Sequence, residues 1–116
     1  MNTRLPALVA TALAFGGPAV LAVSEAGAAT TDRVTMTEFK FALSKKTVPK
    51  GAVTFQLVNR GSVSHDFKIA GKTSAKVNPG KSGTLKVTFK RKGRYPYVCT
   101  LPGHAEAGMK GTLTVK

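Results

Sequence analysis

The sequence predicts an all-β domain, folded as an antiparallel β-sandwich or barrel. About six or seven short segments of strand character are separated by turn-forming residues at intervals of roughly 8–12 residues. Apolar residues follow a helical period for no more than a turn or two, whereas a parallel α/β sheet would need long helices between its strands. Together these observations favour packed sheets of short strands.

The expected strands follow one another through most of the chain. The clearest is 85–89, where Leu85, Val87 and Phe89 alternate with polar residues, so that one face is apolar and the other is basic. The strongest turn signal between strands is Asn78-Pro79-Gly80. The expected strands are 34–41, 53–58, 65–69, 85–89, 94–99 and 109–115.

Residues 1–29 are predicted to be a secretory signal peptide, and residues 30–116 the mature domain. Arg4 precedes an uncharged apolar run from Leu5 to Val23, and Ala26-Gly27-Ala28 provides the small residues of a cleavage site. A Gly-Gly-Pro sequence interrupts the apolar run, which suits a cleaved signal better than a membrane anchor. We therefore expect an extracytoplasmic protein, located in the periplasm or at the cell surface.

The chain is strongly basic, with 18 Lys and Arg against 5 Asp and Glu and a net charge of +13. The predicted signal peptide contains one charge of each sign, Arg4 and Glu25, so the mature domain keeps the same net charge. Such a charge attracts anionic partners. We expect acidic redox proteins as partners, with an anionic membrane surface as a second candidate and no role for nucleic acid. The alternative is that the charge serves only solubility. A monomer is expected.

The chemically informative segment runs from Cys99 to Met109. Cys99 is the only cysteine in the chain, so it cannot form an internal disulfide. His104 follows five residues after Cys99, and Met109 follows five residues after His104. Between them, Leu101-Pro102-Gly103-His104 has Pro and Gly at the central positions of a type II turn, which can return His104 toward Cys99. A thiol, an imidazole and a thioether can therefore converge from one loop.

His65 is the only other histidine, and it supplies the fourth donor of a metal site. Two histidines, one cysteine and a weak axial methionine form the ligand set of blue-copper electron-transfer sites. Zinc sites more often use further Cys, His or carboxylate ligands than Met. The sequence therefore predicts one type 1 copper ion bound by His65, Cys99, His104 and Met109.

On these residues the sequence resembles the cupredoxins, the blue copper proteins related to plastocyanin, pseudoazurin and auracyanin. The resemblance runs from Val34 to Val115 and is carried by His65 and by Tyr-Pro-Tyr-Val-Cys99-x4-His104-x4-Met109. It implies a Greek-key β-sandwich with copper near one end. It also implies that His65 is the buried ligand and that His104 is the exposed ligand through which electrons leave.

Asp66 departs from the family pattern, in which Asn often follows the first histidine ligand. Its backbone N–H can still reach the Cys99 sulfur, and its side chain can reach Thr100. An ionised Asp66 would place negative charge near the metal and lower the reduction potential. The potential of the family is therefore not carried over to this chain.

The resulting functional prediction is a single-electron carrier, not an enzyme. No open coordination position for a substrate is evident. Consecutive strand residues point to opposite faces, so Ser64-His65-Asp66 cannot assemble as a catalytic triad. The alternative function is copper trafficking or storage. That alternative is less favoured because such proteins usually expose Met-rich and His-rich sites, and this chain has only 3 Met, one of them the initiator.

Overall fold

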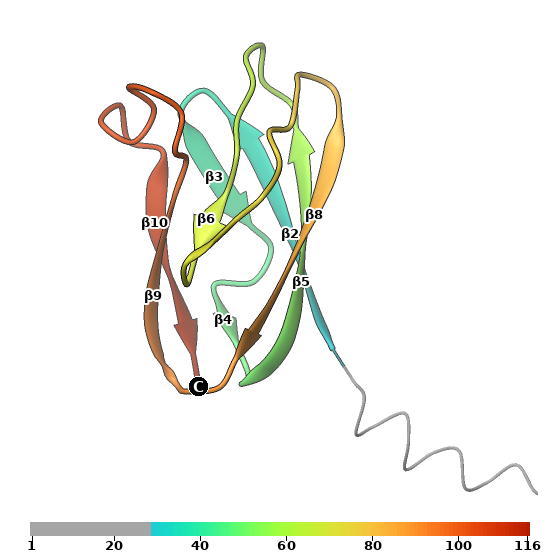
Figure 1. Ribbon diagram of the computed structural model, residues 1–116, viewed down its shortest axis with the longest axis vertical. Coiled ribbons are helices and arrows are strands. Elements are labelled where there is room, and N and C mark those ends of the chain that lie inside the picture. Colours follow the sequence, from blue (N-terminus) through green and yellow to red (C-terminus); the bar gives the residue numbers. More distant parts are fainter. Residues whose placement is uncertain (1–28) are drawn as a thin grey trace, which may run out of the picture.

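The computed structural model describes residues 29–116, which fold into two β-sheets packed face to face (Figure 1). One sheet has the strand order β3-β2-β5-β8, and the other has the order β4-β10-β9-β6-β7. The first contains Lys40–Leu43 (β3), Thr30–Thr37 (β2), Gly51–Asn59 (β5) and Ser82–Phe89 (β8). The second contains Thr47–Val48 (β4), Lys110–Val115 (β10), Gly93–Val98 (β9), Lys68–Ile69 (β6) and Lys72–Thr73 (β7).

This architecture confirms the predicted all-β sandwich. Strands that are neighbours in a sheet are often distant in sequence, as Greek-key connections require: β2 lies beside β5, and β10 lies beside β4. Both of these pairs are parallel, while the other pairs are antiparallel. Within residues 29–116, no helix is long and apolar enough to cross a membrane.

The core between the sheets is centred on aromatic rings. Phe67 is fully buried, and its ring centroid lies 5.1 Å from those of Phe41 and Phe55 and 5.4 Å from that of Tyr97. Aromatic pairs at these separations add to the free energy gained from burying the rings. Tyr97 and Cys99 are buried and Tyr95 is half-buried, so the face of the chain that carries these alternate residues points inward.

The prediction of a single strand over 34–41 is wrong, because these residues belong to two strands, β2 and β3. The chain reverses at Glu38 and Phe39, and β2 and β3 pair as an antiparallel hairpin in which Thr37 lies opposite Lys40. The turn also makes a tertiary contact, in which the Glu38 carboxylate accepts hydrogen bonds from the backbone of a distant loop at Ser62 and Val63. Alternation in the sequence carries no information about such a contact.

The expected strand 65–69 is shorter in the structure. Only Lys68 and Ile69 form β6, while His65 makes a single bridge to Val77, with N–H···O distances of 3.1 and 2.8 Å. His65 therefore lies just outside the regular sheet, at the end of the sandwich where β9 stops and β10 begins. The predicted signal peptide falls almost entirely on residues 1–28, which lie outside the described residues, and it remains a prediction.

Candidate metal centre

The loop between β9 and β10 brings two predicted ligands together at one end of the sandwich, opposite the end that carries the β8–β9 turn (Figure 1). The His104 N–H donates to the Leu101 carbonyl at 3.1 Å, and Gly103 has φ of 81°, as the third residue of a type II turn requires. The predicted turn is therefore present. The Met109 N–H donates to the His104 carbonyl, and the Cys99 N–H donates to the Met109 carbonyl, both at 3.1 Å.

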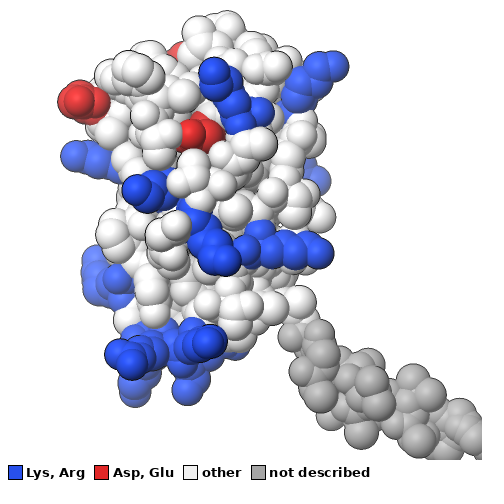
Figure 2. Space-filling model, viewed as in Figure 1, with Lys and Arg blue, Asp and Glu red and all other residues white. Residues whose placement is uncertain are grey.

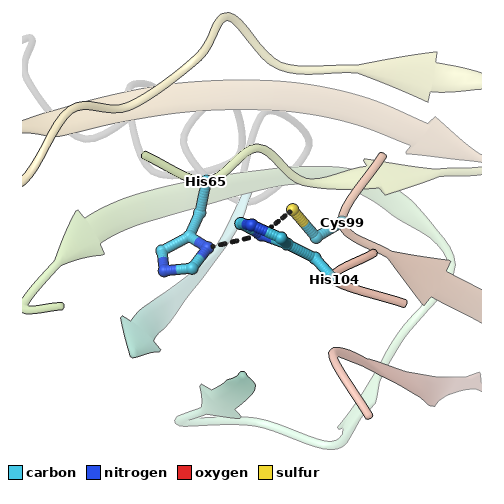
Figure 3. Close-up of side chains that lie close together, drawn as sticks. All are labelled: His65, Cys99 and His104. Atoms are coloured by element: carbon cyan, nitrogen blue, oxygen red, sulfur yellow. Dashed lines mark hydrogen bonds between the residues drawn. The ribbon is translucent and has the colours of Figure 1, made fainter. Parts of the chain in front are cut away.

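The side chains of His65, Cys99 and His104 point toward one another (Figure 3). The Nδ1 atoms of the two histidines are 3.2 Å apart, and Nδ1 of His104 is 3.4 Å from Sγ of Cys99. One donor atom from each residue lies within 4.8 Å of the other two. Two of these residues come from the β9–β10 loop and the third from the segment before β6, so the cluster joins parts of the chain far apart in sequence.

The spacing of these donors fits a single metal ion. A metal–nitrogen bond is about 2.0–2.1 Å long and a metal–thiolate bond about 2.3 Å, so one ion can contact donor atoms that lie roughly 3–4 Å apart. Two imidazoles and a soft thiolate match the trigonal His₂Cys set of type 1 copper. The cluster is also shielded from solvent on one side, because His65 and Cys99 are buried, while His104 is only half-buried. The two histidines thus differ in burial in the expected direction, and their roles as ligands remain a prediction.

Burial adjusts the proton affinity of the donors. It lowers the pKa of His65, and the neighbouring His104 adds to this effect, so the neutral imidazole that binds metals is favoured. Burial raises the pKa of the Cys99 thiol, although hydrogen bonds from the backbone N–H groups of Asp66 and Leu101 act in the opposite direction. Metal binding therefore has to displace the thiol proton.

Asp66 braces the cluster as expected. Its Oδ1 accepts a hydrogen bond of 2.7 Å from the Thr100 N–H, and its Oδ2 is bonded to the Thr100 hydroxyl. Thr100 follows Cys99, and Asp66 follows His65, so this contact ties the two ligand-bearing segments together directly behind their donor atoms. Such outer contacts hold ligands in place.

Met109 lies in the same end of the core. Its side chain is fully buried, and its backbone is hydrogen-bonded to the two other ligand residues of the loop. Its role as the weak axial ligand remains a prediction. Met36 is likewise fully buried but lies within β2, as expected for a residue of the core.

The structure adds two residues that the sequence did not indicate, both in the β2–β3 turn. The Phe39 ring lies edge-on to His104, with a centroid distance of 4.9 Å, and is 37% exposed. Glu38 Oε1 lies 3.4 Å from Nε2 of His65. In the sequence, only the rarity of acidic residues could have drawn attention to Glu38, which is one of five Asp and Glu in a chain with 18 Lys and Arg.

Comparison with known proteins agrees with this site. The family model of the cupredoxin-like domain matches residues 6–115. Auracyanin-B of Chloroflexus aurantiacus is 52% identical over 42 residues, which cover 36% of this chain and 18% of that protein. The copper-resistant cuproprotein CopI of Rubrivivax gelatinosus is 30% identical over 109 residues, covering 74% of this chain and 66% of that protein.

The solved structures extend this likeness to the whole sandwich. Dithionite-reduced auracyanin of Roseiflexus castenholzii superposes with a TM-score of 0.65 at 26% identity, covering 78% of this chain and 99% of that one. The chain matches less than two thirds of the length of the curated relatives named above. The fold, the His-Cys-His cluster and the family match together show that this chain belongs to the cupredoxin-like domain family and is a blue copper protein with a type 1 copper cofactor.

Proposed function

We propose that this protein is an exported single-electron carrier, not an enzyme, and that His65, Cys99, His104 and Met109 hold its copper ion. The observation that carries the proposal is the asymmetry of this set: His65, Cys99 and Met109 are buried, and His104 alone is half-buried. Bound copper supplies a one-electron redox centre. Donors fixed by a folded sandwich suit electron transfer, because a geometry that changes little between oxidation states keeps the reorganisation energy low.

The surface around His104 suits brief contact with a partner. Phe39 packs against the imidazole and is itself partly exposed, so the ligand edge lies within an apolar patch. Small apolar patches support docking without a permanent interface. The patch combines Phe39 with apolar residues of the β9–β10 loop and comprises Phe39, Leu101, Pro102, Ala105 and Ala107.

The charge distribution supports an acidic redox partner. Figure 2 shows Lys and Arg side chains spread over the visible face, with few acidic ones. Lys40, Arg60 and Lys110 are exposed on or next to segments that form the copper-binding end. A field of this sign raises the rate at which anionic partners meet the protein. An anionic membrane surface offers the same chemistry, and we propose that the carrier acts as a monomer.

A copper-trafficking role is the second candidate, because the CopI relative is a copper-resistance protein. The two functions differ in how fast they release the metal. A carrier with buried donors retains copper in both oxidation states, whereas a trafficking protein must pass it on. Loss of Cu(I) to a mild chelator within seconds would favour trafficking, and retention over hours would favour the carrier.

The decisive experiment is a visible absorption spectrum of residues 30–116 during titration with Cu(II). We expect an intense blue thiolate-to-copper band that saturates at one copper per chain and is bleached by ascorbate. A weak or non-stoichiometric response would show that these residues do not form a type 1 site, and would remove the basis of the carrier proposal.

Met109→Leu is expected to keep the blue colour and to raise the reduction potential. The thioether is a weak axial donor that favours Cu(II), and the potential of such sites depends on the axial ligand. Cyclic voltammetry of the copper-loaded variant measures the shift. Met36→Leu is the matched control, since it makes the same substitution at a fully buried methionine within β2. Equal potentials for the two variants would argue against axial ligation by Met109.

Electron transfer to an anionic reagent is expected to slow as salt is added. Between about 0.01 and 0.15 M ionic strength the Debye length falls from about 30 to about 8 Å, which screens the attraction of the basic surface. Stopped-flow rates with hexacyanoferrate(III) measure the effect, and cationic hexaammineruthenium(III) is the control, with the opposite salt dependence. A flat response to both reagents would leave the basic surface without a role in encounter.

A further inference from the structure

The second ring nitrogen of His65, Nε2, is a buried polar atom of the metal centre that lacks a hydrogen-bond partner among residues 29–116. Nδ1 faces His104 and the metal cluster, so Nε2 points to the opposite side of the ring. His65 is fully buried, and among residues 29–116 no group makes a hydrogen bond of normal geometry to Nε2. Histidines that bind metals nearly always donate this second N–H to an acceptor, which fixes the tautomer and the orientation of the ring.

The group next to Nε2 is the carboxylate of Glu38, whose Oε1 lies 3.4 Å away. This distance is longer than the roughly 2.7–2.9 Å of a hydrogen bond between a charged donor or acceptor pair, so a small movement of the flexible Glu38 side chain would complete the bond. A carboxylate is the strongest acceptor that a protein can offer to an imidazole N–H. The Glu38 side chain is partly exposed, at 28%, so burial of its charge is only partial.

Glu38 is held in this position by the loop that leads to His65. Its Oε1 accepts backbone hydrogen bonds from Ser62 at 2.7 Å and from Val63 at 2.9 Å. The bond from Val63 lowers the pKa of Glu38 most, and the bond from Ser62 adds to this effect. Both favour the ionised carboxylate. The carboxylate is therefore fixed by the protein itself and does not depend on contact with the metal or with solvent.

Gly61 makes room for this arrangement. A Cβ at position 61 would lie 2.5 Å from Oε1 and 2.6 Å from Oε2 of Glu38, closer than real Cβ contacts allow. Gly61 has no positive φ that would itself require glycine. The space beside the Glu38 carboxylate thus accounts for a glycine here, and an alanine would displace the carboxylate without removing it.

We propose that Glu38 is the positioning residue of the metal centre: it accepts the Nε2–H of His65, presents Nδ1 to the metal, and lowers the reduction potential of the bound copper. The inference rests on the proposed copper ligands. The role is structural and electrostatic, because Glu38 acts through His65 and does not bind the metal. A fixed negative charge behind a ligand stabilises the higher charge of Cu(II) relative to Cu(I).

The first test is Glu38→Gln, measured as the reduction potential of the copper-loaded protein. Glutamine keeps the shape and an oxygen acceptor for the loop, but it removes the charge. We expect the affinity for Cu(I) relative to Cu(II) to rise about tenfold, which for one electron is a potential increase of about 59 mV. Glu106→Gln is the matched control, because Glu106 is an exposed acid in the ligand loop itself. Equal shifts in the two variants would overturn the proposal.

The second test is Gly61→Ala, which leaves every charge in place. If displacement of the Glu38 carboxylate is what matters, Gly61→Ala raises the potential in the wild-type background and has no further effect in a Glu38→Ala background, where the clash is gone. Such a result is a coupling between the two positions. Additive effects of the two substitutions would show that Gly61→Ala acts on the loop alone, and would overturn the proposal.

The third measurement needs no copper. Nitrogen chemical shifts of the His65 ring in the metal-free protein report which nitrogen carries the proton. We expect the Nε2–H form to predominate in the wild type and a mixture of tautomers in Glu38→Ala, and an unchanged tautomer would count against Glu38. If the wild type binds copper without a blue band, the proposed function fails. If the wild type is blue but Glu38→Gln behaves as Glu106→Gln does, only this inference fails.

Discussion

Cys99→Ser is expected to abolish the blue absorption band while leaving the sandwich folded. The band arises from the thiolate sulfur, and a serine hydroxyl is neither a soft donor nor ionised at neutral pH. The backbone of Cys99 remains bonded to Met109 whatever the side chain is. Burying a hydroxyl in place of the thiol lowers the free energy of unfolding by roughly 1–3 kcal/mol, which leaves a stable domain.

Two measurements check this expectation. Titration with Cu(II) monitored in the visible range follows the site, and chemical denaturation of the metal-free protein follows the fold. Thr112→Ser, on an exposed position of β10, is the control for a small change outside the site. An unchanged copper spectrum in Cys99→Ser would mean that the metal is bound elsewhere.

Phe67→Ala is expected to have the largest effect on stability. Phe67 is fully buried and touches the rings of Phe41, Phe55 and Tyr97, so its removal opens a cavity between the two sheets. Substitutions of this type lower the free energy of unfolding by about 3–5 kcal/mol. Because small domains have only about 5–15 kcal/mol in total, the metal-free variant is expected to be close to unfolding.

Urea denaturation of the metal-free protein measures this loss, and Phe39→Ala is the matched control. Phe39 is 37% exposed and lies at the surface of the metal centre, so its truncation is expected to lower stability by less than about 1 kcal/mol. Copper that binds only the folded form should restore part of the stability of Phe67→Ala. At a free copper concentration of a hundred times the dissociation constant, the free energy of unfolding rises by about 2.7 kcal/mol. Equal losses in the two Phe variants would contradict the position of Phe67 at the centre of the core.

The site was largely predictable because its chemistry is concentrated in a short segment. Cys99, His104 and Met109 lie in one loop, and the Pro-Gly turn between the first two indicates how the chain returns on itself. His65 was the only further histidine that could be chosen as a ligand, because the chain contains only two histidines. The fold was predictable for a similar reason: alternation such as that in 85–89 reports directly which face of a strand is buried.

The contribution of the β2–β3 turn was not predictable from local pattern. Glu38 and Phe39 reach the metal centre only because β2 pairs in parallel with β5, so that the end of β2 lies beside the loop that follows β5. That adjacency is a property of the sheet order. Within the sequence, Glu38 and Phe39 are simply two residues inside what reads as a continuous strand.

The hydrogen bonds that close the β9–β10 loop bear on whether the protein folds before it binds its metal. Cys99 is joined to Met109, and Met109 to His104, by backbone bonds that need no metal, and Asp66 ties Thr100 to the segment of His65. The segments that carry the donors are thus held to one another by bonds of the chain itself, and a donor set ordered in this way leaves less conformational entropy for an ion to remove. Folding before metal loading is therefore the order that we expect.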